Sequence, residues 1–129
     1  RWAKKYDLPF SVPAAFPIKT SRALRGAIAM RQWGKEADFI NEIFAAYWER
    51  GDGSIGEYKT LRKIASSLDV DPQEFESVSE SEGVRQALID STNTAMDKGV
   101  FGVPSIIIGD ELYWGKDRME FVEEHLSRL

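Results

Sequence analysis

One segment of the chain alone has the pattern of a β-sheet. Residues 105–108 form a β-branched run, residues 112–114 form a second apolar run, and Gly109 and Asp110 lie between them. Glycine and aspartate are residues that tight turns favour. The segment therefore predicts a β-hairpin. Because everything before residue 99 has a helical pattern, the chain must combine a helical block with this one small sheet.

The Val103-Pro104 pair stands directly before the first predicted strand. At the start of a strand the missing N–H of proline removes no ladder hydrogen bond. The bond is a candidate for the cis form, which for X-Pro costs only about 0.5–1 kcal/mol over trans. In the cis form the backbone N–H and C=O of Val103 would face outward, free to pair with an extended peptide.

The residues around the hairpin show the periodicity of amphipathic helices. We predict helices from about residue 20 to 33, from 35 to 50, around 58–68, after Asp71-Pro72, from 81 to 98, and from 117 to 128. Gly34 should end the first of these helices, and Asp71 should start the fourth with Pro72 at its first position. On the helix 81–98 we expect six residues to face inward, namely Val84, Ala87, Leu88, Ser91, Ala95 and Met96. On the last helix we expect the same of Met119, Val122 and Leu126. Asp117 and Glu120 have the spacing of a capping box that would open this last helix.

Composition and charge exclude several classes of partner. The chain has 129 residues, and its 17 basic and 21 acidic residues give a net charge of −4, so we predict no nucleic-acid partner. It has no cysteine, which excludes thiol chemistry on its own side chains. No apolar run approaches the roughly 20 residues that cross a bilayer, and we expect a cytoplasmic protein without a membrane partner.

The sequence offers no metal site and no isolated catalytic group. Glu123-Glu124 and the pair Asp69 and Asp71 lack companions at metal-ligand spacing, so we predict no metal. His125 is the lone histidine and stands near the end of the last predicted helix. We expect it to interact with the helix C-terminus rather than to catalyse a reaction.

Several segments together resemble a known family. Gly99-Val-Phe-Gly-Val-Pro104, the short hairpin, and Trp114-Gly-Lys-Asp-Arg118 are similar to the C-terminal half of the 2-hydroxychromene-2-carboxylate isomerase family. These proteins are relatives of kappa-class glutathione transferases and of DsbA-type thioredoxin-fold proteins. Residues 1–10, the Phe16-Pro17 turn with the segment 22–25, and residues 44–49 are similar to the helical insertion of that family.

The resemblance implies an α/β fold of the thioredoxin-like DsbA/kappa type with a helical insertion. We therefore expect residues 1–98 to form the insertion domain and residues 99–129 to form the C-terminal β-β-α half of the thioredoxin-like domain. Two strands alone are marginally stable in water. We expect either that residues before Arg1 complete the sheet or that another chain does so, for example in a homodimer.

The resemblance also implies a function, namely a glutathione-dependent isomerase or transferase that acts on a small aromatic substrate. Its reactive serine or cysteine would lie before Arg1, so we expect the 129 residues alone to be inactive. Two alternatives remain open. One is a DsbA-like thiol-disulfide oxidoreductase with an upstream Cys-x-x-Cys, and the other is a non-catalytic thioredoxin-like peptide-binding module.

From the resemblance we expect Val103, Pro104, Asp117 and Arg118 to bind glutathione. The backbone of Val103 would pair with the cysteinyl unit, and the Asp117 carboxylate would meet the γ-glutamyl ammonium. The first amides of the last helix would meet the carboxylate, with Arg118 adding positive charge nearby. The alternative for Asp117 is a simple helix cap.

Two aromatic residues are candidates for a substrate pocket. The loop of residues 8–17 contains three prolines, which prevent a continuous helix. Phe10 and Phe16 in this loop would line a pocket for a flat hydrophobic substrate, as the family resemblance implies. The alternative is that both rings pin the loop to the protein core.

Overall fold

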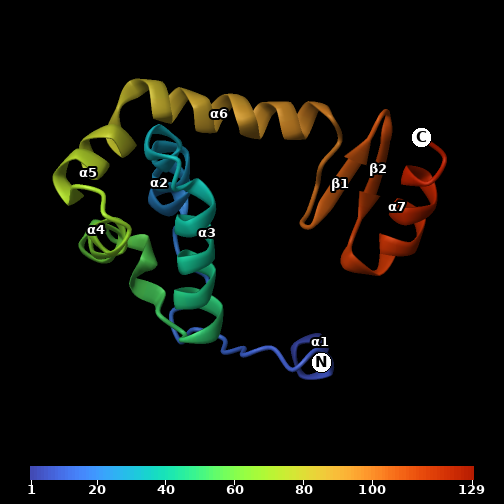
Figure 1. Ribbon diagram of the computed structural model, residues 1–129, viewed down its shortest axis with the longest axis horizontal. Helices are drawn as coiled ribbons and strands as arrows, with labels where there is room; N and C mark the ends of the chain where they lie inside the picture. The colour runs from blue at the N-terminus through green and yellow to red at the C-terminus, as the bar shows by residue number, and fades with distance from the viewer. The chain divides into compact units, whose positions relative to one another are not determined.

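The computed structural model describes residues 1–129, and the chain divides into a helical unit, Arg1–Leu88, and a hairpin unit, Ile89–Leu129. The helical unit contains α1 (Trp2–Lys5), α2 (Ser21–Ala29), η1 (Met30–Trp33), α3 (Glu36–Phe44), η2 (Ala45–Glu49), η3 (Gly53–Gly56), α4 (Tyr58–Ser67) and α5 (Pro72–Glu80). Helix α6 (Glu82–Asp97) contains the boundary between the units. It is followed by β1 (Ser105–Ile108), β2 (Glu111–Trp114), η4 (Lys116–Arg118) and α7 (Met119–Leu126) (Figure 1). None of the helices has the length and apolar character needed to cross a membrane.

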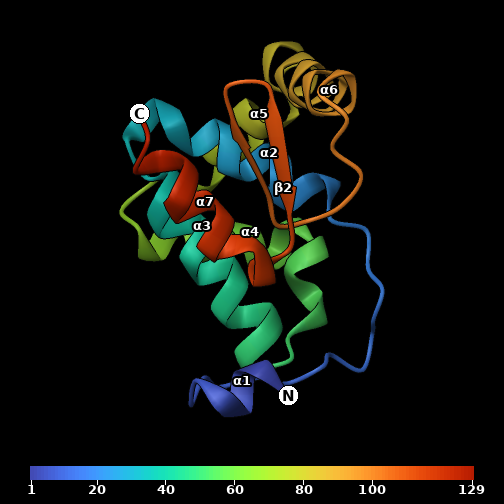
Figure 2. The same ribbon diagram turned by 90° about the vertical axis from the view of Figure 1, so that its right-hand side faces the viewer.

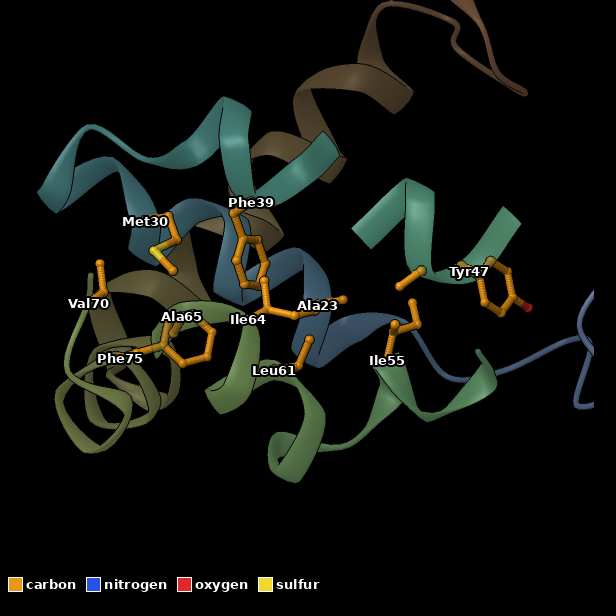
Figure 3. Close-up of a cluster of buried hydrophobic side chains, with 11 residues drawn as sticks. Ala23, Met30, Phe39, Tyr47, Ile55, Leu61, Ile64, Ala65, Val70 and Phe75 are labelled. Atoms are coloured by element: carbon orange, nitrogen blue, oxygen red, sulfur yellow. The ribbon is translucent and has the colours of Figure 1, made fainter. Parts of the chain in front are cut away.

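The core of the helical unit lies between α2, α3, α4 and α5. Their apolar side chains point toward one another in Figure 3, and Phe39, Leu61 and Phe75 are fully buried. The rings of Phe39 and Phe75 are 5.4 Å apart between centroids. Gly26 on α2 allows this approach, since a Cβ there would lie 2.9 Å from Cζ of Phe75. The predicted amphipathic helices therefore converge on one aromatic centre.

Local signals set several helix ends as expected. Asp71 accepts hydrogen bonds from the backbone N–H groups of Gln73 and Glu74 and opens α5, with Pro72 at its first position. Gly34 ends η1 with φ +66°, a left-handed conformation in which glycine carries no Cβ penalty. The predicted helix 35–50 is not uniform, because α3 gives way at Ala45 to the π-helical segment η2.

The hairpin unit confirms the predicted strands. β1 and β2 pair antiparallel, with Ser105 opposite Trp114 and Ile108 opposite Glu111. Gly109 in the connecting turn has φ +58°. Helix α7 packs against β1, and the hairpin and its helix can be followed in Figures 1 and 2.

The burial expected for α6 and α7 is found only in part. No residue of α6 is fully buried, but Val84, Ala87, Leu88 and Ala95 are half-buried, whereas Ser91 is exposed and Met96 is 65% exposed. On α7 only Val122 is buried, whereas Met119 and Leu126 are exposed. Apolar periodicity indicates which face of a helix can be buried. For α7 that face is only partly covered, because β1 and β2 have four residues each and present little surface.

Candidate functional site

The hairpin unit brings the two halves of the predicted glutathione site together. The backbone N–H of Gly115 donates to the carbonyl oxygen of Pro104 at 2.9 Å, which extends the β1–β2 pairing by one hydrogen bond. This bond holds Val103 and Pro104 beside the turn that carries Asp117 and Arg118. The Val103-Pro104 peptide bond is cis, as the sequence suggested.

Val103 itself is 88% exposed and makes no hydrogen bond within the chain. The loop that carries it is held by other residues. Ser105 Oγ donates to the carbonyl oxygen of Gly102 at 2.6 Å, and the rings of Phe101 and Trp114 lie 5.1 Å apart. A Cβ at Gly102 would lie 2.6 Å from Nε1 of Trp114, so the indole packs directly on the loop backbone. The loop is thus held in place, and it exposes the unpaired backbone N–H and C=O of Val103 to solvent.

Gly115 sets the position of the Asp117 carboxylate. Its φ is +98°, and a Cβ there would lie 2.6 Å from Oδ1 of Asp117. The carboxylate therefore occupies space that is open only because residue 115 is glycine. Oδ2 of Asp117 accepts a hydrogen bond of 3.3 Å from the guanidinium of Arg118, and both side chains are more than half exposed. Ion pairs of this kind contribute about 0–1 kcal/mol, so a ligand can compete for either partner.

The predicted capping box at Asp117 is wrong. Residues 116–118 form the short 3-10 turn η4, and α7 begins only at Met119 with Arg118 in the N-cap position. Asp117 is one residue too early to cap α7, and neither η4 nor α7 has a side-chain cap. Asp117 therefore does not act as a helix cap, and its carboxylate is exposed.

The two aromatic residues predicted to line a substrate pocket meet on a third ring, that of Trp48 in η2. Phe10 stacks on Trp48 with centroids 5.9 Å apart and an interplanar angle of 11°, and Phe16 lies 6.1 Å away at 51°. Tyr47 packs edge-on against the same indole at 4.7 Å. Phe10 and Phe16 are 57% and 58% exposed. The loop is therefore attached to the helical unit, as the alternative required, but both rings keep a free surface.

A cavity of about 700 Å³ adjoins this cluster and is not lined by Phe10 or Phe16. Trp48 lines it together with five apolar residues, namely Leu8, Pro9, Phe44, Ala45 and Leu68. Three carboxylates also line it, those of Asp38, Glu42 and Glu49. Glu42 pairs with Arg50 at 2.5 Å, and Asp38 lies 3.9 Å from the ammonium of Lys35. The role of Trp48 in joining the two phenylalanines depends on segments more than 30 residues apart, and the sequence pattern did not reveal it.

The structure also gives His125 a partner that the sequence did not reveal. The Tyr113 hydroxyl lies 2.8 Å from Nδ1 of His125 and donates to Glu111 at 2.9 Å. Partial burial, followed by the hydrogen bond to Glu111, raises the pKa of Tyr113. No group of three or more histidine, cysteine or acidic residues is placed to hold a metal ion.

The fold and the comparisons with known proteins define the class of the protein. The sequence matches the DSBA-like thioredoxin domain family over residues 1–127, and the chain belongs to this family. It is also similar to 2-hydroxychromene-2-carboxylate isomerases. That of Pseudomonas sp. (strain C18) is 33% identical over 125 residues, which are 95% of this chain and 57% of the relative. That of Pseudomonas putida is 32% identical over 133 residues, which cover the whole chain and 62% of the relative.

A solved structure of a 2-hydroxychromene-2-carboxylate isomerase has the same fold. It superimposes with a TM-score of 0.83 at 29% identity, over 99% of this chain and 62% of the other. The resemblance drawn from the Val-Pro and Gly-Lys-Asp-Arg segments is therefore confirmed, as is the DsbA-like thioredoxin fold class. The chain spans about three fifths of the length of the relatives it matches.

Proposed function

We propose that the chain is the ligand-binding part of a 2-hydroxychromene-2-carboxylate isomerase that uses glutathione. The observation that carries this proposal is the hydrogen bond between Gly115 and Pro104, which joins an unpaired backbone unit to an exposed carboxylate. Similarity to isomerases over nearly the whole chain supports the isomerase class.

The residues at the hairpin end fit glutathione chemically. Glutathione is an extended peptide, and the N–H and C=O of Val103 have no partner in the chain, so they offer the pairing of an added strand. The Asp117 carboxylate would accept the γ-glutamyl ammonium in a charge-assisted hydrogen bond. Arg118 and the first amides of α7, which lack a side-chain cap, would attract the γ-glutamyl carboxylate.

When bound, glutathione would supply a thiolate nucleophile to the reaction. The residues of this chain would hold its peptide backbone and its charged end, and they contain no thiol of their own. We further propose that the exposed faces of Phe10 and Phe16, backed by Trp48, bind the aromatic ring of the substrate. Glu49 lines the neighbouring cavity without an ion pair, and its carboxylate would repel a substrate carboxylate and keep that group outside the cavity.

Calorimetric titration with glutathione tests the proposal directly. It should be done on the longest protein that contains these residues, because the chain spans only part of its relatives. We expect saturable binding and an at least tenfold loss of affinity for Asp117→Asn, which removes a charge-assisted hydrogen bond. Glu123→Gln on exposed α7 changes the net charge equally and should bind as the parent does. Absence of glutathione binding to the parent protein would refute the proposal.

The aromatic site has its own test in an isomerisation assay. Phe10→Ala removes the ring that stacks on Trp48, so we expect a higher KM for the aromatic substrate with kcat changed less. Phe10→Leu keeps apolar volume but has no stacking face, so its substrate KM should lie between those of the parent protein and Phe10→Ala. A substrate KM that is unchanged in Phe10→Ala would contradict the assignment of this ring.

A further inference from the structure

A second cavity in the helical unit carries an excess of positive charge. It has a volume of about 500 Å³ and lies where the start of α2 meets η3, α4, α5 and the first turn of α6. Its charged lining consists of four cations and two carboxylates: Lys19, Arg22, Arg25, Arg85, Glu76 and Glu80. The cations exceed the carboxylates by two, although the chain as a whole has a net charge of −4.

Both carboxylates of this cavity already have cationic partners. Oε1 of Glu80 accepts from the guanidinium of Arg25 at 2.5 Å and also from the Tyr58 hydroxyl, and Oε2 pairs with Arg85. Glu76 pairs with Arg62 at 3.0 Å. Both carboxylates are therefore paired, and three side chains, those of Arg25, Tyr58 and Arg85, hold Glu80.

Donors remain after these pairs are made. Arg22 makes one long hydrogen bond, 3.4 Å to the carbonyl oxygen of Gly56, and its guanidinium lies 5.4 Å above the Tyr58 ring. Lys19 is exposed and has no ion pair. Nε of Arg25 is buried without any acceptor. A guanidinium offers five donors, so this cluster has more donors than its two carboxylates can engage.

We propose that this cavity binds the phosphate group of a small molecule, held by Lys19, Arg22 and Nη1 of Arg85, the nitrogen of Arg85 that makes no bond to Glu80. A phosphate monoester carries a charge of about −1.5 to −2 near neutral pH, which matches the excess of two positive charges. A ligand with a single carboxylate would neutralise only half of this excess positive charge. The planar donor pairs of arginine also suit phosphate oxygens. This site is independent of the proposed glutathione site, since all its residues belong to the helical unit.

The test uses titration with inorganic phosphate, followed by amide chemical shifts or calorimetry at constant ionic strength. We expect saturable binding in about the millimolar range, centred on residues 19–25, 56–58 and 80–85. The double variant Lys19→Gln/Arg22→Gln should bind at least about tenfold more weakly, since it removes two of the three proposed phosphate contacts. The matched control is Arg31→Gln/Lys35→Gln, which removes two exposed cations of the same unit that pair with Glu36 and Asp38.

Each outcome decides the question. Absence of saturable phosphate binding to the parent chain, or equal weakening in both double variants, would overturn the proposal. Acetate that binds as tightly as phosphate would overturn it too, because charge alone would then explain the effect. The Asp117→Asn variant should keep its phosphate affinity, so failure of the glutathione proposal leaves this measurement unaffected.

Discussion

The two units of the chain maintain their structure in different ways. In the helical unit a cluster of buried apolar side chains is assembled from α2, α3, α4 and α5 around Phe39 and Phe75. In the hairpin unit Val122 is the one buried apolar side chain, and order comes from backbone hydrogen bonds and close packing over Gly102 and Gly115. Regions with few buried contacts open at low free energy and are often the ones that bind ligands. The proposed glutathione residues lie in that less buried unit.

The largest expected effect lies in the core of the helical unit. Phe75→Ala removes a fully buried ring that packs against Phe39, and should cost about 3–5 kcal/mol in the free energy of unfolding. Chemical denaturation followed by far-UV circular dichroism measures it. Phe121→Ala, on an exposed ring of α7, is the control and should cost less than a quarter as much. Equal losses would mean that the two units do not differ as described.

A smaller effect is expected from filling space in the same core. Gly26→Ala places a methyl group 2.9 Å from Cζ of Phe75 and 3.0 Å from Cζ of Phe39. Overpacking should destabilise the helical unit by about 1–3 kcal/mol, against a gain of at most about 1 kcal/mol in helix propensity. Gly83→Ala on exposed α6, where nothing lies within 4 Å, should be neutral or stabilising. A stabilised Gly26→Ala would show that the core is not tightly packed there.

In the hairpin unit the corresponding change is Val122→Ala. It removes two methyl groups from the one buried apolar side chain of that unit and should cost about 1–2 kcal/mol. Amide hydrogen exchange should accelerate in β1, β2 and α7, while α2 and α4 keep their protection. Faster exchange throughout the helical unit would contradict the division into two separately stabilised parts.

The smallest effect concerns pH. Hydrogen bonds from the Ser54 hydroxyl and then the Ser54 backbone N–H lower the pKa of Asp52 from its ordinary 3.8, because they favour the charged carboxylate. Its stabilisation is therefore complete above pH 3.8 and is lost as pH falls through the lower pKa of the folded state. Asp52→Asn should cost about 0.5 kcal/mol at neutral pH and progressively less as the pH is lowered below 3.8. A cost that stays constant with pH would refute this explanation.

The sequence predicted those features that depend on neighbouring residues. The Gly109-Asp110 turn, the Asp71 cap and the Gly34 helix end were correct because each depends on its own few residues. Asp117 met the spacing of a capping box but fails as a cap, since η4 moves the N-cap of α7 one residue later, to Arg118. The Glu80 cluster and the rings around Trp48 could not be predicted, because their partners come from segments up to 55 residues apart.

The π-helical segment Ala45–Glu49 has a consequence for how related chains can differ. A π turn accommodates one more residue than an α turn, so this helix can lose a residue without breaking. Such a loss would rotate every later side chain of the helix by about 100° relative to α3. In a homologue one residue shorter here, Trp48 would no longer face Phe10 and Phe16, and a different side chain would meet the aromatic ligand.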